Sequence, residues 1–393
     1  MAHPIAPRFR STFSTHQYVK MILFEFIEDI TKSKTHLEHP EDYVLLYGSK
    51  GALRAVDAMV DLLNGGGTLS IKYDGYPALI FGRNVDGQLV VADKHMFHKK
   101  DGSGRVKSVR EFIEYDLRRG ANRGDLYQKL QVLWPRLEKA VPKDFRGYFW
   151  GDLLYVGKLV EKNGTFFFSP NTVTYTVSTN SNLGKKIRNS VGGIVVHQFY
   201  KDYDSDPIPV QSLTQLNTDT SKTGLVIIDS HASVRGLKKP VQLVNNCYNL
   251  IKQYGDAIDD FLDSSKTAEY NIKGLSSLLQ RYVNSRVRGE TRDFMTWLST
   301  SKYVNDARTL IGNDGYLVKN AHGLTAMFAV FDAISELKNN IIMQCDNLVS
   351  NDIVGFINGV RGGEGYVYYD KNGTFKMVNR QTFSFANFAR NGH

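Results

Sequence analysis

The segment Lys72-Tyr73-Asp74-Gly75 combines residue types that could carry out chemistry on a phosphate. A lysine amine attacks phosphorus only after it loses its proton, so nearby cations or burial must lower its ordinary pKa of about 10.4. Asp74 offers oxygens to a sugar hydroxyl or a metal ion, and Gly75 lets the backbone turn closely against a ligand. The segment therefore predicts a nucleophile at Lys72. Taken alone, it also fits an exposed corner between a strand and a turn.

Three more charged residues follow Lys72 in an order that suits one phosphate-binding groove. Asp152 lies within a predicted apolar strand, Glu364 begins a second strand, and Lys376 lies on the strand that pairs with the second. Asp152 and Glu364 would hold Mg²⁺ or Mn²⁺, and the two lysines would neutralise a triphosphate. Each residue by itself also fits a turn, a rim charge or a solvated surface, but the four together favour a site.

The hydrophobic pattern predicts the elements that must position these residues. Apolar residues recur at helical spacing within 22–30, 51–63, 108–140 and 235–348. Strands are predicted at 68–72, 78–83, 88–92, 147–154, 165–168, 173–177, 193–199, 225–228, 365–369 and 374–379. We therefore expect an α+β fold with three units. These are a helical N-terminal module (1–67), a core of antiparallel sheets (68–232 and 349–393), and a helical insertion (233–348) that is a candidate nucleic-acid-binding unit.

The composition is that of a globular protein with a basic excess. Hydrophobic residues make up 42% of the 393 residues and the formal charge is +9, which favours a polyanionic partner such as nucleic acid. Two cysteines, Cys247 and Cys345, exclude a disulfide framework or a cysteine-rich zinc site and fit a reducing cytoplasm. No apolar run reaches the length of a membrane span and no signal peptide is recognisable, so we expect a cytoplasmic protein without membrane association.

The residues above resemble motifs of the covalent nucleotidyltransferase superfamily, which includes ATP-dependent DNA ligases, RNA ligases and mRNA capping enzymes. Lys72 through Gly75 is similar to motif I, whose lysine becomes adenylylated. Gly151-Asp152 is similar to motif III, whose acidic residue binds ribose, and Glu364-Gly365-Tyr366-Val367 to motif IV, whose glutamate serves metal and sugar. Lys376 is similar to the first lysine of motif V, which contacts the α-phosphate. The resemblance implies an ATP-grasp-like ligase core that uses ATP with Mg²⁺ or Mn²⁺ and binds the nucleotide through Asp74, Gly75 and these residues.

The chain departs from the family pattern at several positions. Val378 occupies the place of the second motif V lysine, and Arg380 is the candidate to replace it from the same strand face. Tyr76-Pro77 stands where an arginine often follows motif I, so Arg83 or Lys94 is expected to supply the positive charge. The separation between motifs III and IV is also unusually long, because the helical block intervenes.

Another glycine-rich strand competes for the place of motif IV. Gly192-Gly193-Ile194-Val195-Val196 has the right apolar tail, but glycine cannot coordinate a metal through a side chain, so Glu364 is preferred. The strand 193–200 is similar instead to the region that offers an aromatic ring to the base, and the sequence leaves open which ring stacks.

A narrower resemblance links the chain to ligase-like proteins of tailed phages. The strings His36-Leu37-Glu38-His39 and Phe375-Lys376-Met377-Val378-Asn379-Arg380 carry it, and it implies the host cytoplasm as the location if a phage encodes the protein. His36, Glu38 and His39 could also contribute to a metal site, but no further ligand at a useful spacing accompanies them, which favours a structural role.

The resemblance favours one function and leaves two others open. Thirteen residues follow Arg380, too few for the five-stranded barrel that DNA ligases and capping enzymes carry after motif V. We therefore expect an RNA-ligase-like enzyme that forms lysyl-AMP at Lys72, transfers AMP to a 5′-phosphate and seals the end with a 3′-hydroxyl. A DNA-ligase-like enzyme acting on DNA ends, or a non-catalytic nucleic-acid- or virion-binding protein with this fold, is the alternative.

Two basic regions have no place in these motifs. The loop that contains Lys99, Lys100, Arg105 and Lys107 could follow a nucleic-acid backbone or be a mobile hairpin tip. The arginines of the insertion (Arg281, Arg286, Arg288 and Arg292) present the same choice.

Overall fold

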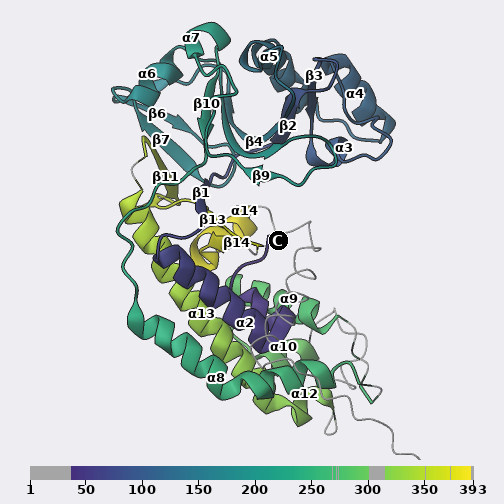
Figure 1. Cartoon of the computed structure of the whole chain (residues 1–393), viewed down its shortest axis with the longest axis vertical. Helices are drawn as coiled ribbons and strands as arrows, with labels where there is room; N and C mark the ends of the chain where they lie inside the picture. Colours follow the sequence, from purple (N-terminus) through teal and green to yellow (C-terminus); the bar gives the residue numbers. More distant parts are fainter. Residues whose placement is uncertain are drawn as a thin grey trace, which may run out of the picture.

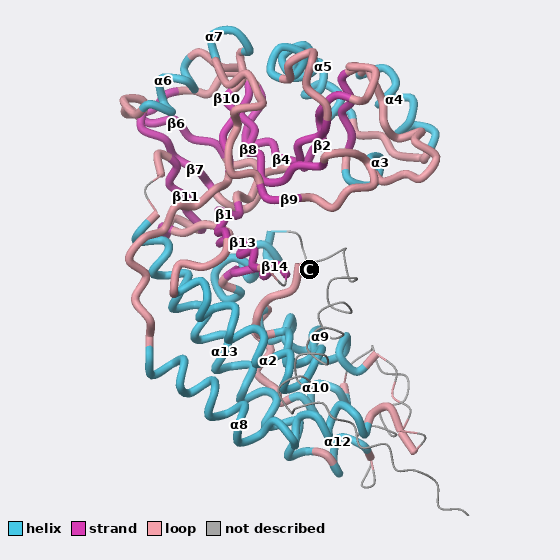
Figure 2. Tube along the Cα trace, in the orientation of Figure 1, coloured by secondary structure: helices cyan, strands magenta, loops and turns pink. Residues whose placement is uncertain are grey.

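The structure is a computed structural model that describes residues 37–390 except 268, 271, 273, 301–314, 350 and 372. The helix predicted at 22–30 and His36 lie outside the described residues. Strands gather in one half of the molecule and long helices in the other (Figures 1 and 2). The expected α+β class is confirmed. None of the described helices combines the length and apolar character that a membrane span requires.

The largest sheet has six strands and carries Asp152. Its strands are ordered β10-β8-β4-β2-β3, with β9 paired to β8. They span β2 Ala78–Arg83, β3 Leu89–Ala92, β4 Gly147–Val156, β8 Gly192–Tyr200, β9 Ile208–Pro209 and β10 Val226–Asp229. The expectation of antiparallel sheets is corrected at one edge, where β10 runs parallel to β8. α4 (Val109–Arg118) and α5 (Gly124–Ala140) share a buried core with this sheet. Ser108 begins α4 by accepting a hydrogen bond from the Glu111 N–H at 3.1 Å.

A three-stranded sheet joins the two ends of the chain. β1 (Thr68–Lys72) pairs antiparallel with β13 (Gly365–Asp370), which pairs with β14 (Gly373–Val378). The other edge of β1 contacts the segment after β10, since the Ile71 N–H donates to the Ser230 carbonyl at 2.6 Å. β1 therefore lies inside a layer of backbone hydrogen bonds, and Lys72 lies opposite Gly365.

A five-stranded sheet in the order β12-β11-β7-β6-β5 completes the strand-rich half. Its strands are β5 Glu161–Lys162, β6 Thr165–Phe168, β7 Thr174–Ser178, β11 Ile353–Ile357 and β12 Val360–Arg361, and α6 (Asn182–Arg188) and α7 (Thr220–Thr223) lie nearby. The sequence analysis missed β5, β9, β11 and β12. Two-residue strands show no alternation of apolar and polar residues, and β11 directly follows a long helix.

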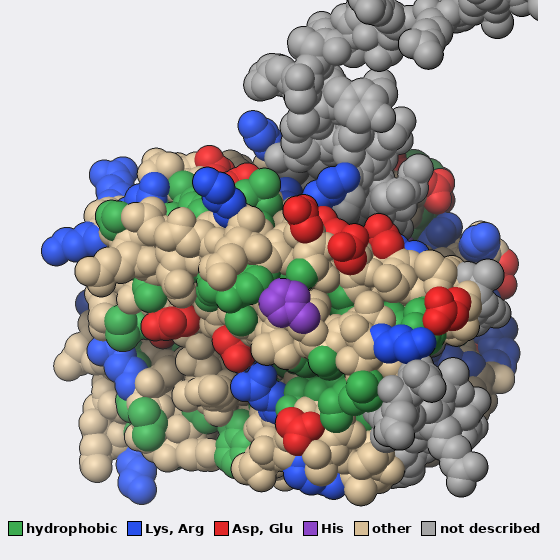
Figure 3. Space-filling model, turned by 90° about the horizontal axis from the view of Figure 1, so that it is seen from below, with side chains coloured by type: hydrophobic (Ala, Val, Ile, Leu, Met, Phe, Trp, Pro, Cys, Tyr) green, Lys and Arg blue, Asp and Glu red, His purple; other side chains and the backbone are tan. Residues whose placement is uncertain are grey.

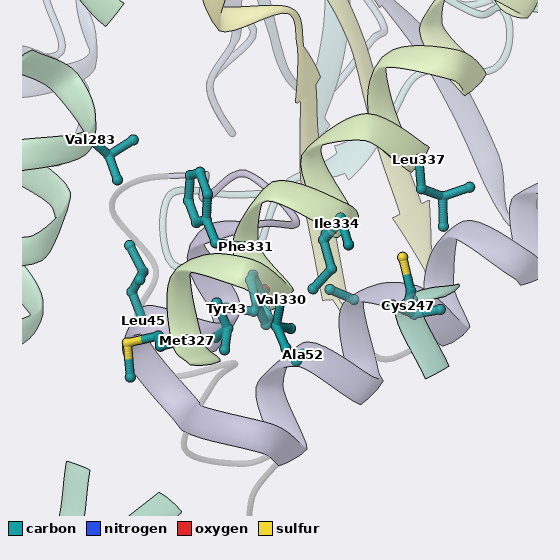
Figure 4. Close-up of a cluster of buried hydrophobic side chains, with 14 of the residues drawn as sticks. Tyr43, Leu45, Ala52, Cys247, Val283, Met327, Val330, Phe331, Ile334 and Leu337 are labelled. Carbon is teal, nitrogen blue, oxygen red and sulfur yellow. The ribbon is translucent and has the colours of Figure 1, made fainter. Parts of the chain in front are cut away.

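The helices of the N-terminal module and of the insertion form one body with a shared core. It consists of α2 Asp42–Leu63, α8 Val241–Ser264, α9 Leu275–Val287, α10 Phe294–Ser299, α12 Tyr316–Lys319 and α13 Ala321–Leu348. Figure 4 shows side chains of α2, α8, α9 and α13 meeting in this core. Tyr366, Tyr368, Phe375 and Met377 belong to the same core, so the helical body covers one face of the three-stranded sheet.

α2 begins well before the predicted start because a glycine allows a kink. Gly48 has φ 64°, and α8 approaches so closely there that a Cβ on Gly48 would lie 2.2 Å from an Asp259 carboxylate oxygen. The Asp259 carboxylate accepts hydrogen bonds from the Ser49 N–H and hydroxyl at 2.8 and 2.6 Å. The kink therefore fixes α2 against α8.

Candidate functional site

Lys72 forms an ion pair with Glu364 at the end of the three-stranded sheet. The Lys72 Nζ lies 2.7 Å from the Glu364 Oε1, and the two side chains are 30% and 8% exposed. The pairing of Lys72 with Gly365, the residue after Glu364, brings the two together from opposite ends of the chain. The structure thus joins two residues that the sequence placed in one site.

The ion pair controls the protonation of Lys72. Burial by itself lowers the pKa of this lysine, but the adjacent Glu364 carboxylate outweighs burial and holds the pKa above its ordinary value. Burial also raises the pKa of Glu364, while Lys72 opposes that shift. Lys72 is therefore an ammonium here, stabilised in its charged form by Glu364.

Lys376 provides a second positive charge near Lys72. Its neighbours Phe375 and Met377 face the helical body, so strand alternation turns Lys376 to the opposite face of β14. Burial, followed by the charge of Lys72, lowers the pKa of Lys376. The Glu364 carboxylate is the anion that acts on both ammonium groups.

Asp152 reaches the site through close packing against Gly75. A Cβ on Gly75 would lie 2.5 Å from the Asp152 Cβ, so only glycine lets the chain after Lys72 pass so near to β4. The charge of Asp152 contributes to the raised pKa of Lys72, behind burial and Glu364. Gly75 therefore allows the close backbone approach that was predicted. The group that it approaches is β4, which carries Asp152, and not a ligand.

Two rings that were not predicted for the site, those of His197 and Trp150, lie beside Asp152 and lead to Lys94. His197 is the extra residue of a β-bulge in β8, because Trp150 pairs with Gln198 while Gly151 pairs with Val196. The bulge points the His197 Nε2 at the Asp152 carboxylate, 3.5 Å away. The Trp150 ring lies 5.2 Å from the His197 ring, and the Lys94 Nζ lies 5.2 Å above the Trp150 ring. Of the two cations proposed to replace the missing arginine, Lys94 is the one beside these residues.

Asp74 serves the fold rather than offering a free carboxylate. Its Oδ1 accepts from the Asn171 side chain at 2.8 Å, and its Oδ2 accepts from the Thr172 and Val173 N–H groups at 2.6 and 2.8 Å. The Asp74 N–H donates to the Tyr175 hydroxyl at 2.6 Å. These contacts replace the expected ligand role: Asp74 fixes the turn after Lys72 to the loop before β7.

Arg83 does not belong to the site, contrary to the sequence-based expectation. Ala78 pairs with Asp152 at one end of β2, whereas Arg83 pairs with Gly147 at the other, roughly 17 Å away at the rise of an extended strand. The buried guanidinium donates to the carbonyls of Val141 and Pro142 at 2.9–3.1 Å, to other nearby carbonyls, and to the Glu138 carboxylate at 2.7 Å. Arg83 joins the end of α5 to the sheet.

Replacing Arg83 by methionine is expected to destabilise the protein by about 2–4 kcal/mol, because buried carbonyls lose their donor. Urea unfolding of the variant measures this loss. Covalent nucleotide labelling per folded molecule should equal that of wild type. A selective loss of labelling without loss of stability would restore Arg83 to the site.

Arg380 lies near Lys376, whose pKa its charge helps to lower, but not on the predicted strand. β14 ends at Val378, so Arg380 is not on the strand face of Lys376 but begins η1 (Arg380–Ser384), which continues into α14 (Phe385–Arg390). Its Nη2 lies 2.5 Å from the Asp42 Oδ2, and its Nε lies 3.6 Å from the Glu41 Oε1. Arg380 therefore attaches the C-terminal segment to the start of α2.

The partners of Arg380 belong to a buried charge cluster, which consists of His39, Glu41, Asp42, Lys338 and Arg380. The Lys338 Nζ lies 2.5 Å from the Glu41 Oε1, with both side chains fully buried. Burial, followed by the charge of Arg380, keeps the pKa of His39 well below its ordinary value, so this histidine is neutral. His39 thus has the structural role that was favoured.

A cavity of about 620 Å³ opens beside Lys72 and Glu364. Its walls come from α13, the segment 351–365 and η1, and they include Tyr73, Asn339 and Gln381. The volume is in the range that small-molecule and nucleotide sites occupy.

The carboxylates present suit a divalent cation that binds together with a nucleotide. Mg²⁺ commonly uses one or two carboxylates and completes its shell with phosphate oxygens and water. Glu364 and Asp152 both raise the pKa of Lys72, and they supply two carboxylates. Within the described part of the chain, no group of three or more His, Cys, Asp or Glu side chains could hold a metal ion. A divalent cation at these two carboxylates would therefore need phosphate oxygens and water to complete its shell.

Glu364→Gln is expected to lower the pKa of Lys72, because it removes the carboxylate that favours the ammonium. The rate at which an amine-selective reagent modifies Lys72 should then rise at lower pH than in wild type, as followed by peptide mass spectrometry. Lys50, exposed on α2, provides the internal control, since its profile should not move. Equal Lys72 profiles in both proteins would contradict control by Glu364.

The chain belongs to the family described as "Family of unknown function (DUF6267)", whose model matches residues 34–391. No curated protein and no solved structure matches the chain.

Proposed function

We propose that this protein is an ATP-dependent polynucleotide ligase, with RNA favoured over DNA, and that it acts through a covalent lysyl-AMP at Lys72. The observation that carries the proposal is the pairing of Lys72 with Glu364 at 2.7 Å, with Lys376 and Asp152 acting on the same ammonium. A nucleotidyltransferase core of the ATP-grasp-like ligase type accounts for this set of residues coming from distant segments.

The proposed reaction has three balanced steps. The Lys72 ammonium first gives a proton to solvent. Its neutral Nζ then attacks the α-phosphorus of ATP: a P–N bond forms, the bond to the β-phosphate bridging oxygen breaks, the nitrogen releases its second proton to solvent, and pyrophosphate leaves. An oxygen of the polynucleotide 5′-phosphate then attacks the same phosphorus, which breaks the P–N bond and returns the amine. Finally a 3′-hydroxyl attacks the 5′-phosphate, loses its proton and displaces AMP.

Each residue of the site has a part in these steps. Lys376 neutralises charge on the α-phosphate. The Glu364 carboxylate keeps Lys72 in its protonated form until the nucleotide is in place. Mg²⁺ or Mn²⁺, held by Glu364 and Asp152, would supply further neutralisation of the triphosphate. Trp150 and His197 offer ring surfaces for the base beside Asp152.

The preference for RNA over DNA is carried by the sequence resemblance to RNA ligases, and transfer of label to RNA or DNA strands decides it. The described residues after β14 form η1 and α14.

The direct test is incubation with ATP labelled at the α-phosphate and Mg²⁺, followed by denaturing electrophoresis. We expect label that stays on the protein, that acid releases as expected for a P–N bond, and that maps to Lys72. Adding 5′-phosphorylated RNA or DNA should then transfer the label to the strand and identify the substrate. Absence of labelling with ATP, GTP and NAD would overturn the proposal.

A second candidate is a nucleic-acid- or virion-binding protein that keeps this fold without catalysis. The observation that favours it is Val378. This residue is fully buried at the position where the nucleotidyltransferase superfamily has the second lysine of motif V. Strand binding without covalent labelling by any nucleotide would support this candidate.

A further inference from the structure

A continuous row of rings and basic side chains leads away from the Lys72 site. It begins with Asp152 and His197, continues through Trp150, and reaches Lys94 at the start of α3 (Lys94–Phe97). Beyond α3 comes the segment that we call the basic loop, residues 98–107. A chain of side-chain contacts thus leads from the site to α3, the helix that precedes the basic loop.

Specific contacts hold part of the basic loop against α3. They argue against the mobile hairpin tip that the sequence left open. A Cβ on Gly104 would lie 2.2 Å from the Met96 carbonyl oxygen, so the loop folds back onto α3 at a position that only glycine can take. Arg105 lies over the Tyr203 ring at 3.6 Å and donates to the Phe97 carbonyl.

Ion pairs fix the base of the loop. The Asp93 carboxylate caps α3 by accepting from the Met96 N–H at 2.8 Å, and it lies 2.9 Å from the guanidinium groups of Arg119 and Arg123. Both arginines also bind Asp116, which is fully buried. The loop therefore presents its side chains from a fixed base.

The basic loop carries positive charge that the protein leaves unneutralised. Lys99, Lys100 and Lys107 are exposed, and none forms an ion pair with any described residue. Asp101, the one acidic residue of the loop, turns back to accept from the Ser103 N–H and hydroxyl at 2.9 and 2.6 Å. These lysines are free to meet phosphates from outside.

The helical body offers less free charge. Arg286 pairs with Asp332, Arg292 pairs with Glu290, and Arg288 lies over the Phe388 ring. Figure 3 shows basic and acidic side chains interspersed on the end of this body, with no field of one sign. Charge complementarity therefore favours the basic loop over the insertion as a nucleic-acid contact.

We propose that the basic loop, with Lys99, Lys100 and Lys107, binds the phosphates of the polynucleotide whose end reaches Lys72. This inference deepens the proposed ligase function and rests on it for the identity of the strand. Exposed lysines beside an exposed ring, that of His98, are the combination that single-stranded nucleic acids bind. Contacts to phosphates do not distinguish ribose from deoxyribose. We therefore expect the basic loop to bind both RNA and DNA.

The test is a triple variant, Lys99→Gln/Lys100→Gln/Lys107→Gln, and a control, Lys162→Gln/Lys185→Gln/Lys252→Gln, which removes the same charge from exposed positions elsewhere. Fluorescence anisotropy with short 5′-phosphorylated single-stranded RNA and DNA measures affinity over a range of salt. We expect the loop variant to lose about tenfold or more in affinity for both strands, and the slope of log K against log salt to fall by about 2. The control variant should lose much less at every salt concentration.

The outcomes separate this inference from the proposed function. Self-adenylylation of the loop variant should match wild type, because ATP alone does not touch the loop. Equal strand affinities of the loop and control variants, or no strand binding by wild type, would overturn the inference. The binding measurement tests the role of the basic loop even if no covalent labelling is found. Absence of labelling would overturn only the proposed ligase function.

Discussion

Lys72→Arg is expected to abolish covalent labelling by ATP, with a loss of at least about three orders of magnitude in rate. Arginine preserves the positive charge that Glu364 requires, but its guanidinium does not deprotonate in proteins and cannot attack phosphorus. The substitution therefore removes the nucleophile and keeps the ion pair. Thermal unfolding should show a melting temperature close to wild type.

Two companion variants make this result specific. Lys72→Met should also abolish labelling but lower stability, because it leaves the Glu364 carboxylate buried without its partner. Lys376→Arg retains the second charge and should label measurably. Label on Lys72→Arg at the wild-type rate would show that another residue carries the nucleotide and would remove Lys72 from the mechanism.

Glu41→Gln is expected to destabilise the protein by about 3–5 kcal/mol. Glu41 neutralises Lys338 where both side chains are fully buried, and its loss leaves an uncompensated ammonium. Burial, against the opposing charge of Glu41, already holds the pKa of Lys338 below its ordinary value. Urea unfolding monitored by tryptophan fluorescence measures the effect.

A double variant separates charge compensation from side-chain packing. Glu41→Gln/Lys338→Met removes both charges and should be more stable than Glu41→Gln alone, giving a coupling energy of at least about 1 kcal/mol. Single and double variants that each cost less than about 1 kcal/mol would show that water already reaches the cluster.

Local patterns were sufficient to predict most strands and the residues of the central ion pair. Strand alternation places Lys72 and Lys376 on definite faces, and both strands were predicted within a residue or two of their bounds. Arg83 and Arg380 were misplaced for a different reason. Which end of a strand meets the site, and where a strand stops, depend on pairing with β4 and on the contact with Asp42, and neither is encoded locally.

The surroundings of Asp152 also could not be predicted from local sequence patterns. His197 reaches Asp152 through a bulge, and the sequence of an apolar strand carries no mark of one extra residue. Asp74 was expected to meet a ligand because its nearest neighbours are Lys72 and Gly75. Its partners, the residues 171–173, lie far along the chain, so only the tertiary structure reveals that its oxygens are already occupied.

The register that joins β1 to β13 has a consequence for biosynthesis. Lys72 is synthesised well before Glu364 and Lys376. Contacts between such distant segments form late, because the long intervening chain must close before they can stabilise the fold. During translation the lysine is therefore present without its carboxylate partner, and the pair that keeps Lys72 protonated assembles only after β13 has been made.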